Sequence, residues 1–162
     1  MSAMKIMDTC TMINIFICLD VDLSPCLKEY RTVVTDQVVS EYTRKHPRQI
    51  PECVSVVGMS ERSKAIAEEM ELLFPRLGSG EVSVFVLALE MASSGSKVVV
   101  LTDDKAATNK FSKMAKDINI SSRFRGSENI IWGDTMSLIQ KFADERRIPR
   151  SFVDKARTAL MR

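Results

Sequence analysis

Five carboxylates lie where a short apolar run ends or where a helix is expected to begin. Asp8 follows the first such run, Asp103 and Asp104 follow another, and Glu41 and Glu81 lie in the first turns of predicted helices. The carboxyl ends of parallel strands share one edge of a sheet, so these acids should meet there. Crowded carboxylates repel one another, and burial increases the cost. Mg²⁺ and Mn²⁺ prefer oxygen ligands, so the pattern predicts a divalent metal site.

Acids around one or two Mg²⁺ ions are suited to cutting phosphodiesters. One ion lowers the pKa of the attacking water, and the same or a second ion, about 4 Å away, stabilises the leaving oxygen. Each acid alone is explained as well by helix capping or by a solvated helix surface. Four acids at one sheet edge are not explained in that way.

The run Val98–Leu101 is expected to be a central strand. It is mostly β-branched and shows no polar alternation, which is typical of a strand covered on both faces in a parallel sheet. Asp103 or Asp104 can cap the helix that follows. Predicted strands and helices alternate along the whole chain, which indicates an α/β protein with right-handed crossovers. The other strands are expected at Lys5–Asp8, Thr32–Val34, Cys53–Val57 and Asn129–Trp132, and the helices at Thr9–Ile17, Cys26–Tyr30, Gln37–Lys45, Arg62–Phe74, Glu81–Ala92, Lys105–Asp117, Met136–Phe142 and Phe152–Leu160.

Some apolar and cysteine positions carry expectations about burial. In the helix 62–74 the candidate core residues are Ile66, Met70, Leu72, Leu73 and Phe74. The four cysteines form no C-x-x-C pair and the chain has one histidine, so we expect no zinc site and reduced, mostly buried thiols.

The composition is that of a globular protein. The 162 residues correspond to one domain, 1–162, with 45% hydrophobic and 27% charged residues. The net charge of +2 permits a polyanionic partner. No apolar run approaches the roughly 20 residues that span a bilayer, and the first residues lack a signal-peptide core, so we expect no membrane association and a cytoplasmic location.

Four segments, in order, resemble the motifs of the PIN-domain nucleases. Their sequences are Met7-Asp8-Thr9, Val38-Val39-Ser40-Glu41, Gly78-Ser79-Gly80-Glu81 and Leu101-Thr102-Asp103-Asp104-Lys105-Ala106-Ala107. The resemblance covers roughly Lys5 to Ala143. Two features depart from it: Thr108 stands where the family usually has arginine, and the segment 121–128 is more polar and basic than the expected short link.

This resemblance implies a fold, an activity and partners. It implies a three-layer α/β/α sandwich with strand order 3-2-1-4-5 and an endoribonuclease that depends on Mg²⁺ or Mn²⁺. Many small members are toxins of toxin–antitoxin modules and are often dimers. We therefore expect an RNA substrate, a cognate antitoxin and a homodimer.

The site residues follow from the residues and the resemblance together. Asp8, Glu41, Glu81 and one of Asp103 and Asp104 are expected to hold the metal. The spacing permits either member of the pair, so we keep both in the catalytic set and assign Asp104 to the metal. The hydroxyls of Thr9 and Thr102 are expected to orient a water or a carboxylate.

The basic residues after this site admit two interpretations. Lys105, Lys110, Lys113 and Lys116 share one helix, and Arg123 and Arg125 follow it. They form either a phosphate-binding track beside the acids or an ordinary solvated surface. Phe124, between the two arginines, either stacks on a base or anchors the loop in the core.

Three other functions stay open at this stage. One is a non-catalytic PIN-like module that binds RNA or protein, and another is a stand-alone RNA-processing nuclease. The third is a phosphatase-type enzyme with an aspartate nucleophile, which needs Asp-x-Asp after the first strand, whereas Asp8 is followed by Thr9 and Cys10.

Overall fold

A five-stranded, all-parallel sheet forms the centre of the protein. The computed structural model describes residues 3–19 and 21–161. The strand order is β3-β2-β1-β4-β5, which confirms the predicted α/β class and strand order. In the register of the central strands, Ile6 lies opposite Val33 on one side and Val100 on the other. The strands are β1 (Met4–Met7), β2 (Arg31–Thr35), β3 (Ser55–Val57), β4 (Val98–Leu101) and β5 (Ile131–Gly133).

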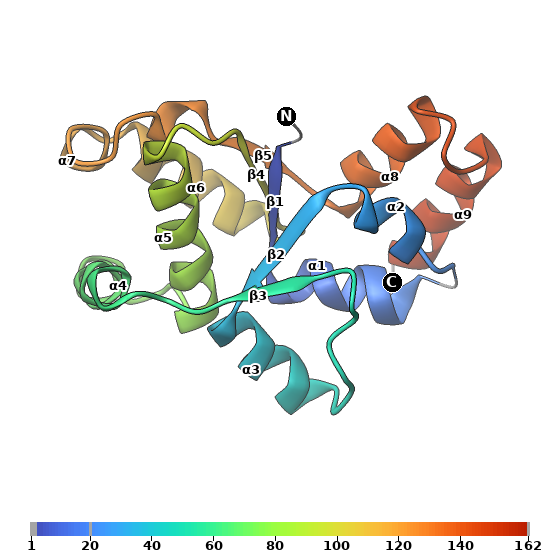
Figure 1. Ribbon diagram of the computed structural model, residues 1–162, viewed down its shortest axis with the longest axis horizontal. Coiled ribbons are helices and arrows are strands. Elements are labelled where there is room, and N and C mark those ends of the chain that lie inside the picture. Colours follow the sequence, from blue (N-terminus) through green and yellow to red (C-terminus); the bar gives the residue numbers. More distant parts are fainter. Residues whose placement is uncertain (1–2, 20, 162) are drawn as a thin grey trace.

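Helices cover both faces of the sheet, which gives the predicted three layers. Helices α4, α5 and α6 lie on one face, and α1, α2, α8 and α9 lie on the other (Figure 1). Helix α3 packs against both α1 and α5 near the carboxyl ends of the strands. The helices are α1 (Thr9–Ile13), η1 (Asn14–Cys18), α2 (Ser24–Lys28), α3 (Asp36–Lys45), α4 (Glu61–Leu73), α5 (Ser79–Ser93), α6 (Lys105–Lys116), α7 (Ile118–Ser121), η2 (Ser127–Asn129), α8 (Thr135–Asp144) and α9 (Arg150–Leu160).

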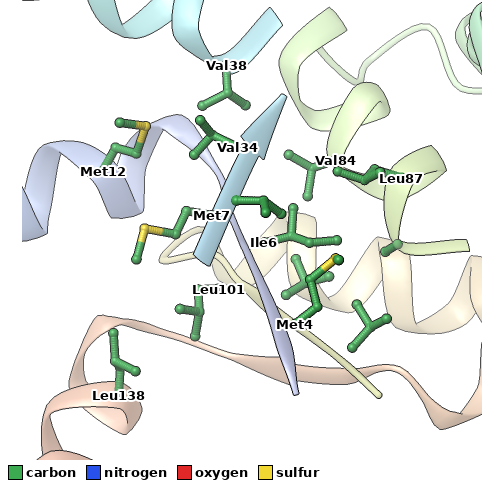
Figure 2. Close-up of a cluster of buried hydrophobic side chains, with 14 of the residues drawn as sticks. Met4, Ile6, Met7, Met12, Val34, Val38, Val84, Leu87, Leu101 and Leu138 are labelled. Carbon is green, nitrogen blue, oxygen red and sulfur yellow. The ribbon is translucent and has the colours of Figure 1, made fainter. Parts of the chain in front are cut away.

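Alternate residues of the central strands fill the two halves of the core. Ile6 points toward the side of α5, near Val84, whereas Met7 and Leu101 point toward the opposite layer, where Leu138 lies (Figure 2). Ile6, Met7, Leu101 and Val84 are all at most 2% exposed. Helix α5 is buried around most of its circumference, as its continuous apolar sequence predicts. Among the described residues, no helix combines the length and the apolar character required to cross a bilayer.

The predicted helix 9–17 changes its geometry partway along. It is α-helical to Ile13 and continues as the π-helix η1, in which the Leu19 amide donates to the Asn14 carbonyl at 3.0 Å. A helix therefore covers the predicted range, but only its first part is α-helical. The short elements α7 and η2 were not predicted, because each is too short to show a hydrophobic periodicity.

Two of the predicted core residues of α4 are exposed instead. Ile66 and Met70 are buried, but Leu72 is 84% exposed and Leu73 is 61% exposed. Helix α4 packs mainly against α5 and lies at the outside of its layer. It therefore buries only a narrow stripe, and the last turn lies outside that stripe.

The cysteines are free, as predicted, but they are not mostly buried. Cys26 is buried and Cys53 is half-buried, whereas Cys10 and Cys18 are exposed. Cys10 and Cys18 lie on α1 and η1, whose outer sides face solvent. The prediction treated these thiols as small apolar groups and did not take the helix face into account.

A lysine lies inside the central strand β1. Lys5 is 2% exposed, and its ammonium group has no hydrogen-bond partner among the described residues. The Nζ atom lies 3.6 Å from the centre of the Tyr30 ring. Burial, reinforced by the charge of Lys141 and opposed by Glu145, lowers the pKa of Lys5 to about 8. The charged form of Lys5 is therefore disfavoured in the folded state.

We predict that Lys5→Met raises the free energy of unfolding by about 2 kcal/mol at pH 7. The lowered pKa corresponds to a penalty of about 3 kcal/mol, and loss of the cation–π contact with Tyr30 offsets part of the gain. Between about pH 8 and the unfolded-state pKa near 10.5, the folded wild type binds fewer protons than the unfolded chain. The stability of the wild type should therefore rise with pH in that window, and the advantage of the variant should shrink.

Urea denaturation of both proteins from pH 7 to 10.5 measures this difference. Lys97→Met, at an exposed lysine, is the control and should show a flat difference from the wild type. An advantage of Lys5→Met that stays constant across the window would contradict the role of the buried charge.

Candidate active site

Asp8 begins the site at the carboxyl end of β1. Its amide donates to the Leu101 carbonyl at 3.1 Å, which continues the pairing with β4. Its Oδ1 accepts from the Thr11 amide at 2.8 Å and so caps α1. The residue is only 7% exposed. Burial raises the pKa of Asp8, with repulsion from Asp103 acting in the same direction, although hydrogen bonds from Thr102 and Thr11 oppose the shift.

Glu41 reaches the same edge from α3 and is held at both oxygens. The Thr9 hydroxyl donates to Oε2 at 2.8 Å, and the Gly80 amide at the start of α5 donates to Oε1 at 3.0 Å. A β-carbon at position 80 would lie 2.5 Å from Oε1 of Glu41. Gly80 therefore lets the carboxylate approach the N-terminus of α5.

Glu81 lies in the first turn of α5, next to this contact, and is half-buried. Burial raises its pKa, and the charges of Asp104, Asp8 and Glu41 raise it further, while Lys110 opposes them. Cys10 is exposed as a residue, but partial desolvation of its thiol and then the charge of Asp8 raise the pKa of that thiol. The negative charges predicted to meet at this edge are therefore close enough to interact.

Asp103 and Asp104 have different environments. Asp103 accepts from Asn14 Nδ2 and from the Thr135 amide, each at 2.8 Å, and also from the hydroxyls of Thr11 and Thr135. This carboxylate joins α1, η1 and α8 to the end of β4. Asp104 is exposed and caps α6, with Oδ1 accepting from Ala106 and Ala107 amides at 2.9 and 3.2 Å. The sequence allowed either aspartate to cap α6, and the structure shows that Asp104 does so.

The predicted threonines and two of the lysines lie at this edge as well. Thr102 is 2% exposed, and its hydroxyl accepts from the Asp104 amide at 3.3 Å. The Thr9 hydroxyl binds Glu41. Lys105 is exposed at the start of α6, and Lys110 is close enough to lower the pKa of Glu81.

Arg123 and Arg125 do not lie beside the acids. Arg123 pairs with Glu69 of α4 at 2.9 Å, and Arg125 lines a cavity with Ser93 and Val98, at the opposite end of α5 and β4. At 1.5 Å per residue, Ser93 is roughly 18 Å along α5 from Glu81. A phosphate track from the acids to these arginines is not formed. Phe124 is 3% exposed, so it anchors the loop in the core and does not offer its ring to a base.

The acids have oxygen ligands suited to a hard cation, but their side chains are not arranged around one. Within residues 3–19 and 21–161, no three His, Cys, Asp or Glu side chains are positioned so that together they could hold a metal ion. Asp8 and Asp104 each use Oδ1 for a helix cap, which leaves their second oxygens for other partners. Glu41 uses both oxygens within the protein. The donor chemistry fits Mg²⁺ or Mn²⁺, and binding would require these side chains to turn.

Sequence reasoning missed the partners that hold the acids in place. Thr11 and Asn14 are three residues apart, so they share a helix face after the Asp8 cap, and this spacing was a usable signal. Thr135 comes from a distant segment, and no local pattern connects it to Asp103. The role of Gly80 depends on the approach of Glu41 from another helix.

Comparison of the chain with protein-family models, curated protein sequences and solved structures gives no match.

We predict that Asp103→Ala costs about 3 kcal/mol of unfolding free energy and that Asp104→Ala costs about 1 kcal/mol. Removing the Asp103 carboxylate leaves the donors of Asn14 and Thr135 without their acceptor, whereas removing Asp104 loses one exposed helix cap. Urea denaturation of the two variants, without divalent ions, measures the difference. Equal costs would show that the Asp103 contacts do not anchor the fold.

Proposed function

We propose that this protein hydrolyses RNA phosphodiester bonds with Mg²⁺ or Mn²⁺ at the carboxyl edge of its sheet. The observation that carries the proposal is that Asp8, Glu81 and Asp104 lie together at this edge, where burial and then the charges of Asp104 and Asp8 raise the pKa of Glu81. These three residues come from distant parts of the chain, and Lys110 is the cation that opposes them at Glu81. Helix capping alone does not explain why Glu81 lies close to the negative charges of Asp104 and Asp8.

Asp8, Glu81 and Asp104 are the proposed metal ligands, with Glu41 beside them. Asp104 is favoured over Asp103 because it is exposed and uses one oxygen for its cap, whereas Asp103 is engaged with Asn14, Thr11 and Thr135. When bound, Mg²⁺ or Mn²⁺ would neutralise the carboxylates and lower the pKa of an attacking water. Asp103 is proposed to act as a positioning residue for the β4–α6 connection.

The surrounding side chains have supporting tasks in this proposal. Thr9 and the Gly80 amide hold Glu41 at the edge, and the Thr102 hydroxyl lies between Asp8 and the Asp104 backbone. Lys105 and Lys110 supply positive charge for the phosphates on either side of the scissile bond. Arg123 and Arg125 have no part in this step, because they lie at the other end of the sheet.

Two of the alternative functions, the binding module and the phosphatase-type enzyme, receive less support from the geometry. A binding module has no need for four mutually repelling acids at one edge. An aspartate nucleophile needs a freely accessible oxygen, but Asp8 is 7% exposed and its Oδ1 caps α1. An antitoxin and a homodimer stay predictions from the family resemblance.

We predict that Asp8→Asn lowers the rate of Mg²⁺-dependent RNA cleavage by at least about 100-fold. Loss of a ligand charge removes several kcal/mol of transition-state stabilisation, and each 1.4 kcal/mol is a factor of ten in rate. The measurement is single-turnover cleavage of a labelled single-stranded RNA with Mg²⁺ or Mn²⁺. Asp154→Asn, at an exposed aspartate of α9, is the control and should cleave like the wild type. Full activity of Asp8→Asn would remove Asp8 from the mechanism.

We predict that Gly80→Ala weakens Mn²⁺ binding by about tenfold and leaves the fold intact. The added β-carbon would displace the end of the flexible Glu41 side chain, not the backbone, and alanine favours the helix at this position. The measurement is the rise in Tm as Mn²⁺ is titrated. Gly78→Ala, where an added β-carbon meets no atom within 4 Å, is the matched control and should keep the Mn²⁺ response of the wild type. The same rise in Tm with Mn²⁺ in both variants would show that Glu41 does not contribute to metal binding.

A further inference from the structure

A cavity of about 260 Å³ opens directly beside the carboxylates, between the start of α6 and the end of β5. Thr102 and Asp103 form the wall that it shares with the acidic site. Its other walls include Lys105, Asn109, Trp132 and Ser137. The cavity is therefore adjacent to the place where a phosphodiester would be cut, and it lies on the side of β5, the edge strand next to β4.

Trp132 gives this cavity a rigid aromatic wall. It is half-buried on β5, and its ring stacks on Phe111 of α6 with centroids 5.7 Å apart and planes 25° apart. Phe111 stacks in turn on Phe85 of α5 at 5.0 Å and 10°. Phe85 and Phe111 are fully buried, so the stack holds the indole of Trp132 against the core. A ligand that stacks on Trp132 would lose little free energy in ordering it.

The polar groups around the indole match the edge and the phosphate of a nucleotide. Asn109 is exposed and offers both an amide donor and an acceptor, whereas the Ser137 hydroxyl in the lining is already hydrogen-bonded to the backbone of Asp134. Lys105 is exposed and supplies a cation at the rim. An aromatic face together with adaptable hydrogen-bonding groups and a positive charge is how proteins bind an unpaired base and its phosphate.

The larger cavity at the other end of the sheet has different chemistry. Its volume is about 700 Å³, and its walls include serines, glycines, Lys97, Arg125 and Glu128, with no aromatic residue in the lining. That cavity offers charge without a stacking surface. The features required for base recognition occur together beside the acids.

We propose that the cavity at Trp132 binds one unpaired nucleobase of the RNA strand whose phosphodiester lies at the carboxylates. A base within a duplex cannot present its face to the indole, because its neighbours already cover that face. The position of the scissile bond rests on the proposed function, whereas binding of the base does not.

The first test uses the fluorescence of Trp132, the only tryptophan in the chain. The wild-type protein is titrated in EDTA, so that no cleavage can occur, with a single-stranded RNA hexamer, the same hexamer as a duplex, and a hexamer with abasic sites. We expect saturable quenching by the single strand, about tenfold weaker binding of the abasic hexamer and no quenching by the duplex. No quenching by the single strand, or equal quenching by the abasic hexamer, would overturn the proposal.

The second test separates the base from the backbone. Trp132→Leu should bind a labelled hexamer about tenfold more weakly by fluorescence anisotropy and should bind the abasic hexamer like the wild type. Arg125→Ala, in the larger cavity, is the control and should bind both hexamers as the wild type does. Equal losses for both hexamers in Trp132→Leu would overturn the proposal, and circular dichroism establishes that the variant is folded.

The two proposals can fail independently. Quenching by single-stranded RNA without cleavage in Mg²⁺ or Mn²⁺ would reject the nuclease and keep the base site. Cleavage that is insensitive to Trp132→Leu and to base removal would reject the base site and keep the nuclease.

Discussion

The structure depends on keeping several carboxylates together although they repel one another. The protein meets this requirement largely with backbone amides at the starts of helices. Asp8 caps α1, Asp104 caps α6, and Glu41 accepts from the Gly80 amide at the start of α5. The N-terminus of a helix carries a partial positive charge, so each contact offsets part of the repulsion. Helices α1 and α6 start at this edge because each directly follows a parallel strand, β1 and β4, whereas α5 follows α4 and reaches the edge with its N-terminus.

Asp103 shows a second way of stabilising an acid at this edge. Its carboxylate accepts hydrogen bonds from the Asn14 amide group and from the backbone and side chain of Thr135. It therefore joins η1 and α8 to the end of β4. The two neighbouring aspartates therefore have different structural roles. Asp103 joins elements of the fold, whereas Asp104 remains exposed to solvent at the start of α6.

The sequence predicts the architecture well because strong periodic signals define it. The uninterrupted run of β4 and the apolar helix α5 indicate a covered parallel sheet, and the acids at strand ends indicate the edge at which the carboxylates meet. The details that were missed depend on contacts between distant segments. Arg123 and Arg125 follow α6 and the short helix α7, yet the loop that contains them returns to the far end of α5. No property of those residues alone predicts that return. The stack of Phe85, Phe111 and Trp132 likewise joins three elements that the sequence separates.

The buried lysine of β1 ties two positions of the core to each other. The ammonium group of Lys5 is buried away from water, and its cation–π contact with the Tyr30 ring replaces part of the lost hydration. Lys141 and Arg147 also lie near that ring, so Tyr30 faces three cations. Replacing Tyr30 with an aliphatic residue would leave the Lys5 ammonium group buried without its aromatic partner. In related chains, these two positions should therefore change together, with an aliphatic residue at position 30 accompanied by an uncharged residue at position 5.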